Sequence, residues 1–305
     1  WPTIHRDSCN SNFVPFAGPE SLVTAWTALD GSRLLTAATL GPEGNVYNTT
    51  GIGSTRSHLY ALNPDDGGIV WKSDLLDSRA VYSAVVVDRD GDIYVSDSEE
   101  LFAFYSDGAL KWSIPISDTV YTTAITTDGY LIAVTENGEV MAVNRSDGSL
   151  AADILPLPEG RVVTTTPAIH PVTNRIYIVA GDARVDGYFY GIDFTQGPPG
   201  SFDIAFEAPL MGKYSATNPT ISYNGSHIYL ADRDKFLYAF NEDGSLAWTY
   251  PLSEKCLGWP SIGQNGEIYF LAAQVYIRDA ECESLYSLHI EFGYFPFREK
   301  NARDF

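Results

Sequence analysis

The stretch GRVVTTTPAIHPVTNRIYIVAGD, from Gly160 to Asp182, holds two short strand-like runs separated by a turn, and its second run carries an Ile-Tyr pair. The same rhythm returns in SRAVYSAVVVDRDGDIYVSDS (Ser78–Ser98) and in YSATNPTISYNGSHIYLADRD (Tyr214–Asp234). Apolar and other residues alternate with period two within each run, as strands require. A pattern that recurs at intervals of a few tens of residues indicates a repeat protein, so the repeat decides the fold.

The repeat has three columns of recurring residues. The Ile-Tyr element places one residue of each unit in the first column: Tyr47, Tyr94, Ile132, Tyr177, Tyr229 and Tyr269. A run with a small residue between large ones gives the second: Ala61, Ala103, Ala142, Gly191, Ala239 and Ser287. An Asp-Gly type turn, which favours tight hairpins, then leads to a run that in three units carries a tryptophan: Trp71, Trp112 and Trp248.

Each unit therefore reads as four strands: A with small residues or proline, B with Ile-Tyr, C with the small residue and D with the tryptophan. Four-stranded units of about 40–50 residues predict an all-β fold, a β-propeller of six blades. The run around Trp26 fits strand D, so we expect the N-terminal strand to complete the last blade and close the ring. A seventh blade built from both termini is the alternative. The small residue of strand C is expected to let aromatic side chains of the next blade approach.

The expected organisation is one propeller domain over residues 1–305. An N-terminal segment with the closing strand covers residues 1–34, six repeats cover residues 35–297, and a tail covers residues 298–305.

Composition limits the partners. The net charge of −20 opposes binding to nucleic acid and to anionic membranes. No apolar run approaches the roughly 20 residues that span a bilayer, so no transmembrane segment is expected. Three N-x-S/T sequons, at Asn48, Asn144 and Asn224, favour a glycosylated protein that is secreted or otherwise extracytoplasmic.

The three cysteines are Cys9, Cys256 and Cys282, and no CxxC pair is present, which argues against a zinc site. One disulfide with one free thiol, or three unpaired thiols, both fit this pattern. Cys256 and Cys282 fall in loops on the same face of one predicted blade, so we expect these two to pair if a disulfide forms.

Two stretches, HLYALNPDDGGIVW (His58–Trp71) and FLYAFNEDGSLAW (Phe236–Trp248), resemble repeats of the PQQ-like (quinoprotein alcohol dehydrogenase-like) β-propeller superfamily. The opening WPTIHRDSCNS (Trp1–Ser11) also resembles the start of such propellers. The resemblance implies the fold, and it allows functions from quinone-dependent dehydrogenases to outer-membrane assembly scaffolds. Quinoprotein dehydrogenases are longer, eight-bladed and commonly carry adjacent cysteines, features that this chain lacks, so no cofactor is assigned.

One column suggests a binding site. A basic residue recurs just before strand A in five of six units, and only the third unit lacks it: Arg33, Arg79, Arg161, Lys213 and Lys255. These cations are predicted to ring the mouth of the central channel and bind an anion such as a carboxylate, sulfate or uronate. Acids adjoin most of these positions, so ordinary rim salt bridges worth roughly 0–1 kcal/mol each are the competing interpretation.

Aromatic residues Tyr82, Tyr121 and Trp259 lie near the same mouth, where they either line it or pack between blades. The stretch DRDGDIY (Asp88–Tyr94) resembles the start of a calcium loop but lacks the acid at its twelfth position, so no metal site is assigned. His170 is expected to be structural, and no catalytic constellation can be assembled from the spacing.

Two functions therefore compete. The first is a binding scaffold that presents loops to a protein or glycan partner, including a second copy of the chain. The second is an enzyme at the channel mouth: a lyase or hydrolase acting on acidic sugars, or a quinone-dependent oxidoreductase. A channel filled by the chain's own residues would favour the scaffold.

Overall fold

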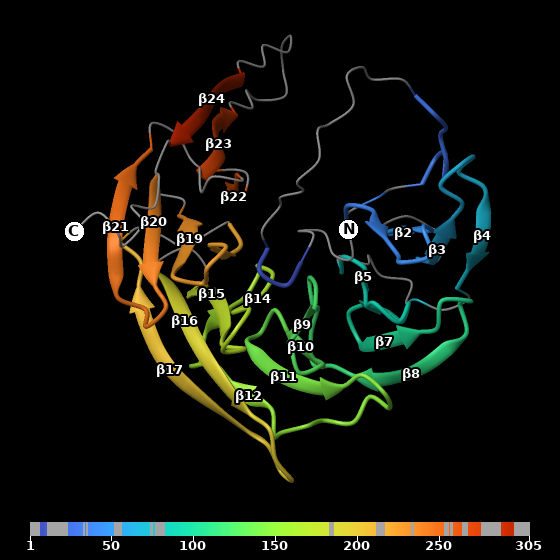
Figure 1. The fold of residues 1–305 in the computed structure, drawn as a ribbon, viewed down its shortest axis with the longest axis horizontal. Helices are drawn as coiled ribbons and strands as arrows, with labels where there is room; N and C mark the ends of the chain where they lie inside the picture. Colours follow the sequence, from blue (N-terminus) through green and yellow to red (C-terminus); the bar gives the residue numbers. More distant parts are fainter. Residues whose placement is uncertain are drawn as a thin grey trace, which may run out of the picture.

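The computed structural model describes residues 7–10, 24–32, 34, 36–51, 57–73, 76, 83–182, 186–211, 217–232, 235–252, 256, 259–263, 268–275 and 288–295. All regular structure in these ranges is β, in six antiparallel sheets that follow one another in chain order around a common centre (Figure 1). No helix among these residues is long and apolar enough to cross a membrane. The predicted all-β propeller is confirmed.

Within a sheet, the strands run in chain order from the centre outwards. The first two sheets contain β1 (Thr39–Leu40), β2 (Val46–Thr49), β3 (Leu59–Leu62) and β4 (Ile69–Lys72), then β5 (Val86–Val87), β6 (Ile93–Ser96), β7 (Glu100–Phe104) and β8 (Leu110–Pro115). The third contains β9 (Ala124–Ile125), β10 (Tyr130–Val134), β11 (Glu139–Asn144) and β12 (Leu155–Pro156).

The fourth sheet has five strands because two short strands share the inner edge of β15. It contains β13 (Arg161–Val162), β14 (Ala168–Ile169), β15 (Ile176–Asp182), β16 (Asp186–Thr195) and β17 (Ser201–Pro209). The fifth contains β18 (Thr220–Ile221), β19 (His227–Ala231), β20 (Phe236–Asn241) and β21 (Leu246–Pro251), and the sixth contains β22 (Ser261–Ile262), β23 (Ile268–Val275) and β24 (Leu288–Phe295).

The sixth sheet has three strands within the described residues. The described N-terminal residues 24–32 contain no strand, although Trp26 donates its indole N–H to the carbonyl of Pro64 at 2.7 Å. Closure of the ring by the N-terminal strand, the number of blades and the domain boundaries therefore stay predictions.

The small residue of strand C packs between aromatic side chains. In the second sheet Ala103 lies between Tyr94 on β6 and Trp112 on β8, and the two rings meet across it with centroids 6.0 Å apart. The first and fifth sheets repeat this row of tyrosine, alanine and tryptophan. The small residue thus makes room for aromatic residues of its own sheet. It also lies in clusters with rings of the next sheet, as expected: Ala61 with Phe102 and Phe104, and Ala142 with Tyr190.

The tryptophan of strand D wedges against the next sheet, as predicted. Trp71 donates its indole N–H to Ser106 O at 2.9 Å, and Trp112 donates to Arg145 O at 2.9 Å. Each acceptor lies in the turn between strands C and D of the following sheet. Beneath the Trp112 ring lies Gly148, with φ +77°, where an added Cβ would sit 2.9 Å from the ring.

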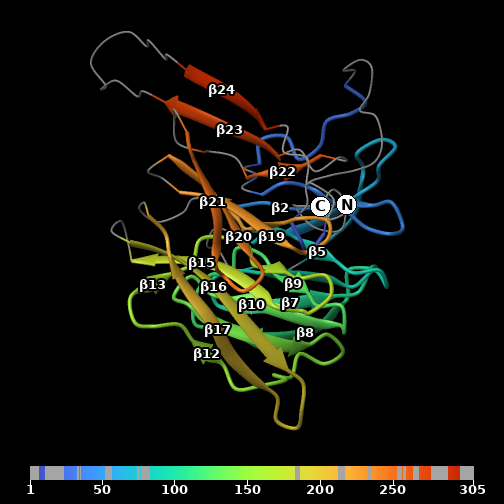
Figure 2. The ribbon, with the colours of Figure 1, turned by 60° about the vertical axis from the view of Figure 1, so that its left-hand side comes forward.

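The third sheet lacks this tryptophan, and its contact with the fourth sheet is made instead by a hairpin of the fourth sheet. The hairpin of β16 and β17 is long and reaches over the outer side of the third sheet (Figure 2). Gly200 donates its N–H to Ala151 O at 3.0 Å, and Phe194 packs edge-on against Tyr130 with centroids 5.1 Å apart.

Replacing Gly148 with alanine is expected to lower the free energy of unfolding by about 2–3 kcal/mol. The side chain would both adopt an unfavourable positive φ and displace Trp112. Gly160 is the matched control, because its φ is +82° and an added Cβ would have no neighbour within 4 Å. Gly160→Ala should cost only the backbone term, about 1 kcal/mol. Equal costs in urea unfolding would show that the tryptophan contact contributes nothing.

Candidate functional site

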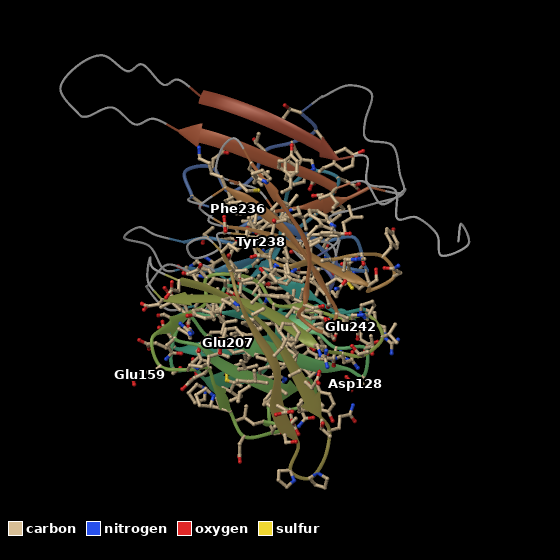
Figure 3. All side chains as sticks on the ribbon, turned by 90° about the vertical axis from the view of Figure 1, so that its left-hand side faces the viewer. Asp128, Glu159, Glu207, Phe236, Tyr238 and Glu242 are labelled. Atoms are coloured by element: carbon tan, nitrogen blue, oxygen red, sulfur yellow. The ribbon has the colours of Figure 1, made fainter. Side chains whose placement is uncertain are left out.

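The ring has two faces. The turns that join strands A to B and C to D lie on one, which we call the A–B face, and the connections from B to C and from D to the next A lie on the other, the D–A face. Figure 3 shows Asp128 and Glu242 on the A–B face and Glu159 and Glu207 on the D–A face. The predicted anion site belongs to the D–A face.

Arg161 is the one member of the predicted basic column within the described residues. Its guanidinium stacks 3.5 Å from the centroid of the Tyr188 ring, donates to the Tyr190 hydroxyl at 3.0 Å and pairs with Glu207 at 3.3 Å. Burial raises the pKa of Tyr190 to about 12, with Arg161 acting in the opposite direction. Arg161 is therefore held against its own sheet, and its acidic partner lies on β17 instead of beside it in the sequence.

Of the other residues predicted at this mouth, two lie within the described ranges. Tyr121 donates its hydroxyl to Glu136 at 3.1 Å, and Trp259 is partly exposed. The remaining predicted residues lie outside the described ranges, and the anion site they would form stays a prediction: Arg33, Arg79, Lys213, Lys255 and Tyr82.

Cys256 is buried in an apolar cluster with Trp248, and Cys282 lies outside the described residues, so their pairing stays a prediction. Among the sequons, Asn224 is exposed in a turn, whereas Asn144 is half-buried and donates its amide to Ser149. Asn48 is buried on β2, which leaves it poorly placed to carry a glycan in the folded chain.

The segment Asp7–Asn10 lies at the centre of the ring, where sequence reasoning placed no side chain. Ser8 accepts the N–H of Ile169 at 2.7 Å through its carbonyl and the N–H of Ile125 at 3.2 Å through its hydroxyl. Cys9 O accepts the N–H of Ile221 at 3.0 Å. One short segment thus joins the innermost strands of the third, fourth and fifth sheets on the A–B face.

Polar groups around this centre bond to one another. Thr166 N donates to Asn218 Oδ1 at 2.9 Å, and Asn218 Nδ2 donates to Thr166 Oγ1 at 3.1 Å, which ties the fourth sheet to the fifth. A quinone cofactor of the kind found in this fold needs an open slot with polar groups directed into it. Thr166 and Asn218 are engaged with each other, so no quinone site is assigned to them.

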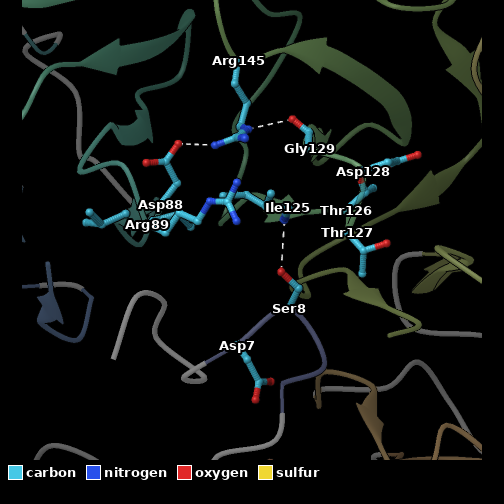
Figure 4. Close-up of a pocket in the computed structure, with 12 residues that line it drawn as sticks. Asp7, Ser8, Asp88, Arg89, Ile125, Thr126, Thr127, Asp128, Gly129 and Arg145 are labelled. Carbon is cyan, nitrogen blue, oxygen red and sulfur yellow. Dashed lines mark hydrogen bonds and ion pairs between the residues drawn. The ribbon is translucent and has the colours of Figure 1, made fainter. Parts of the chain in front are cut away.

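A cavity of about 400 Å³ opens on the A–B face beside this segment, between the second and third sheets (Figure 4). Its lining residues come from four separate stretches: Asp7, Ser8, Val86, Val87, Asp88, Arg89, Ile125, Thr126, Thr127, Asp128, Gly129 and Arg145. No single sequence column contains them, so the repeat pattern could not reveal the cavity.

A buried ion pair forms one wall of this cavity. Asp88 accepts hydrogen bonds from Arg145 and, at 3.0 Å, from the Tyr94 hydroxyl, and its other oxygen accepts the N–H groups of Asp90 and Asp92. The stretch that resembled a calcium loop is thus a turn closed on its own carboxylate. Among the described residues, no group of three or more His, Cys, Asp or Glu side chains is placed to hold a metal ion.

Replacing Arg161 with alanine is expected to lower the free energy of unfolding by about 1–2 kcal/mol, because a stacking contact and a hydrogen bond to a buried tyrosine are both lost. Arg161→Lys should recover little of this, since an ammonium cannot reproduce the planar contacts. The control is Arg89→Ala, whose side chain is 90% exposed and should cost about 0.5 kcal/mol or less. Urea unfolding measures the three variants. Equal losses in the free energy of unfolding would contradict the stabilising role of the Arg161 contacts.

The sequence matches the family described as outer membrane protein assembly factor BamB over residues 55–197, just under half of the chain. Protein Rv3035 of Mycobacterium tuberculosis (strain ATCC 25618 / H37Rv) is 20% identical over 293 residues, which cover 88% of this chain and 69% of that protein.

Solved structures agree on the fold. BamB from Moraxella catarrhalis is 16% identical with a TM-score of 0.50, covering 81% of this chain and 83% of its own. The quinohemoprotein alcohol dehydrogenase of Comamonas testosteroni is 10% identical with a TM-score of 0.56, covering 80% of this chain and 57% of its own. At these identities the likeness concerns the fold alone. Together with the family match over residues 55–197, this likeness supports the predicted resemblance to the PQQ-like β-propeller repeat superfamily.

Proposed function

We propose that this protein is an extracytoplasmic β-propeller scaffold that binds a protein partner on its A–B face. The observation that carries the proposal is the N-terminal segment at the centre of that face, where Asp7–Asn10 bonds to three inner strands. These bonds hold the inner strands of three sheets together on this face, and rigidity lowers the entropic cost of binding a partner.

The family match supports a protein partner and a location outside the cytoplasm. The matching family is described as an assembly factor for outer membrane protein, and BamB has the same fold. An assembly factor of that kind acts by contacting other proteins, so the same use of the propeller is the simplest function for this chain.

Exposed apolar side chains on the A–B face support the same use. Val172 is 77% exposed and Tyr223 is 61% exposed, in the turns that follow β14 and β18. His170 links these two turns, because its Nε2 bonds to Gly225 O at 3.2 Å. Large apolar side chains held on a fixed surface are typical anchors of protein interfaces.

The test is affinity purification of the full chain from cell-envelope extracts of its source organism, with quantitative identification of what co-purifies. Val172→Asp combined with Tyr223→Asp should remove a specific partner. Met211→Asp is the matched control, because Met211 is also exposed but follows β17 on the D–A face. A partner kept by the control and lost by the double variant would support the proposal.

The competing enzyme gives a different result. Pyrroloquinoline quinone with calcium, or a uronate, would raise the melting temperature of an enzyme that binds it. Such a shift, accompanied by turnover of an alcohol or an acidic sugar, would overturn the scaffold proposal. Equal capture by the wild type, the double variant and the control would overturn the assignment to the A–B face.

A further inference from the structure

The innermost strand of the second sheet differs from those of the next three sheets in its hydrogen bonding to the N-terminal segment. Ile125, Ile169 and Ile221 are the second residues of β9, β14 and β18, and each donates its N–H to the N-terminal segment. The equivalent residue of β5 is Val87, which lines the cavity. The N-terminal segment thus provides acceptors to three sheets and leaves the second sheet facing a cavity.

The backbone of Val87 points towards that cavity. Asp88 N donates to Asp92 O at 2.9 Å across the turn, so antiparallel alternation directs the N–H of Val87 away from β6 and towards the centre. The side chain of Val87 is buried in the core, so its contribution to the cavity is main-chain. Within the described part of the chain, none of the turn, loop and side-chain hydrogen bonds provides an acceptor for this N–H.

The opposite wall supplies a cation with spare donors. A guanidinium has five N–H groups, and Arg145 uses one for Asp88 and one, at 2.7 Å, for Gly129 O. The Tyr94 hydroxyl also lies beside this guanidinium, whose remaining N–H groups belong to a residue that lines the cavity. In Figure 4 the Arg145 guanidinium lies between Asp88 and Gly129, with the Arg89 side chain reaching towards it.

The acids of the cavity are already engaged. Asp88 accepts four hydrogen bonds, and Asp128 accepts from the Thr126 hydroxyl and from Gln196. Asp7 accepts the N–H of Cys9 at 3.1 Å. Arg89, in contrast, is largely exposed, and Asp90 lies 4.0 Å from it. The cavity therefore offers a main-chain N–H and two guanidinium groups as donors, beside carboxylates that already accept hydrogen bonds from the chain.

We infer that this cavity binds a carboxylate carried by an extended peptide segment of the protein partner, which places Arg89 and Arg145 on the carboxylate and the Val87 N–H on an acceptor of the segment. The peptide would accept the main-chain N–H of the second sheet, as Ser8 and Cys9 accept the N–H groups of the next three sheets. A volume of about 400 Å³ falls in the range of sites for small organic ligands and exceeds the needs of a carboxylate alone. This inference rests on the scaffold function proposed above and names the chemistry of its partner.

The test titrates the full chain with N-acetyl-triglycine, which ends in a free carboxylate, and with the same peptide as its C-terminal amide, followed by ligand-observed NMR at physiological salt. The acid should bind at least tenfold more tightly than the amide, since charge-assisted hydrogen bonds to the guanidinium groups are lost in the amide. Acetate serves as the source control and should bind more weakly than the peptide acid.

Arg89→Ala should weaken binding of the peptide acid about tenfold. Its matched control is Lys72→Ala, which removes the same charge from an exposed position on β4, outside the cavity. Equal weakening by both variants, equal binding of acid and amide, or acetate binding as tightly as the peptide would overturn the inference. If the envelope partner is still captured by the Arg89→Ala variant at full yield, the cavity assignment fails while the scaffold function stands.

Discussion

Replacing Trp112 with alanine is expected to lower the free energy of unfolding by about 4 kcal/mol, the largest effect of any single substitution considered. The side chain is 8% exposed, packs on Tyr94 and lies over Gly148. Its loss removes a large buried aromatic surface and opens a cavity, which costs about 3–5 kcal/mol. It also leaves Arg145 O without the indole N–H. Denaturant unfolding monitored by far-UV circular dichroism measures the change.

Two further variants separate the contribution of the indole hydrogen bond from that of the buried ring. Trp112→Phe keeps most of the buried ring but removes the N–H, and should cost about 1–2 kcal/mol. Trp71→Ala removes an identical side chain with the same kind of hydrogen bond, to Ser106 O, but from a half-buried position. It should cost about 2–3 kcal/mol. If Trp71→Ala proves as costly as Trp112→Ala, burial is not what sets the strength of the contact between sheets.

The tryptophan contact could be predicted from the sequence because it is local and repeated. Every residue of the row that contains Tyr94, Ala103 and Trp112 lies within one unit of the repeat, so the columns expose it directly. The columns do not identify the ring that the small residue accommodates. A small residue recurs at this position whether the ring belongs to the same sheet or to the next one.

Two features could not be predicted from the repeat columns: the acidic partner of Arg161, and the cavity. The competing interpretation of the basic column paired each cation with an acid that adjoins it in the sequence, which for Arg161 is Glu159. The long hairpin instead brings Glu207 to Arg161 from 46 positions away. The cavity unites the N-terminal segment with turns of two different sheets and Arg145. Contacts of this kind depend on how whole sheets are placed around the centre, and no column of the repeat records that placement.

Replacing Asn10 with alanine is expected to lower the free energy of unfolding by about 3 kcal/mol. Asn10 is 2% exposed, has φ 57° and donates its amide to Pro219 O at 2.9 Å and to Pro167 O at 3.4 Å. Alanine would leave buried carbonyl groups without a donor, which costs about 1–3 kcal/mol. It would also occupy a left-handed conformation that costs about 1–2 kcal/mol outside glycine and asparagine.

Asn10→Gly isolates the amide, because glycine accepts the positive φ without strain, and it should be about 1 kcal/mol less costly than alanine. Amide hydrogen exchange then tests the position of the segment independently of global stability. The N–H groups of Ile169 and Ile221 end on Ser8 and Cys9, so their protection should fall in both variants. Protection that is unchanged in both variants would mean that Asn10 does not hold the segment at the centre. The joined inner strands on which the proposed scaffold function depends would then lack this support.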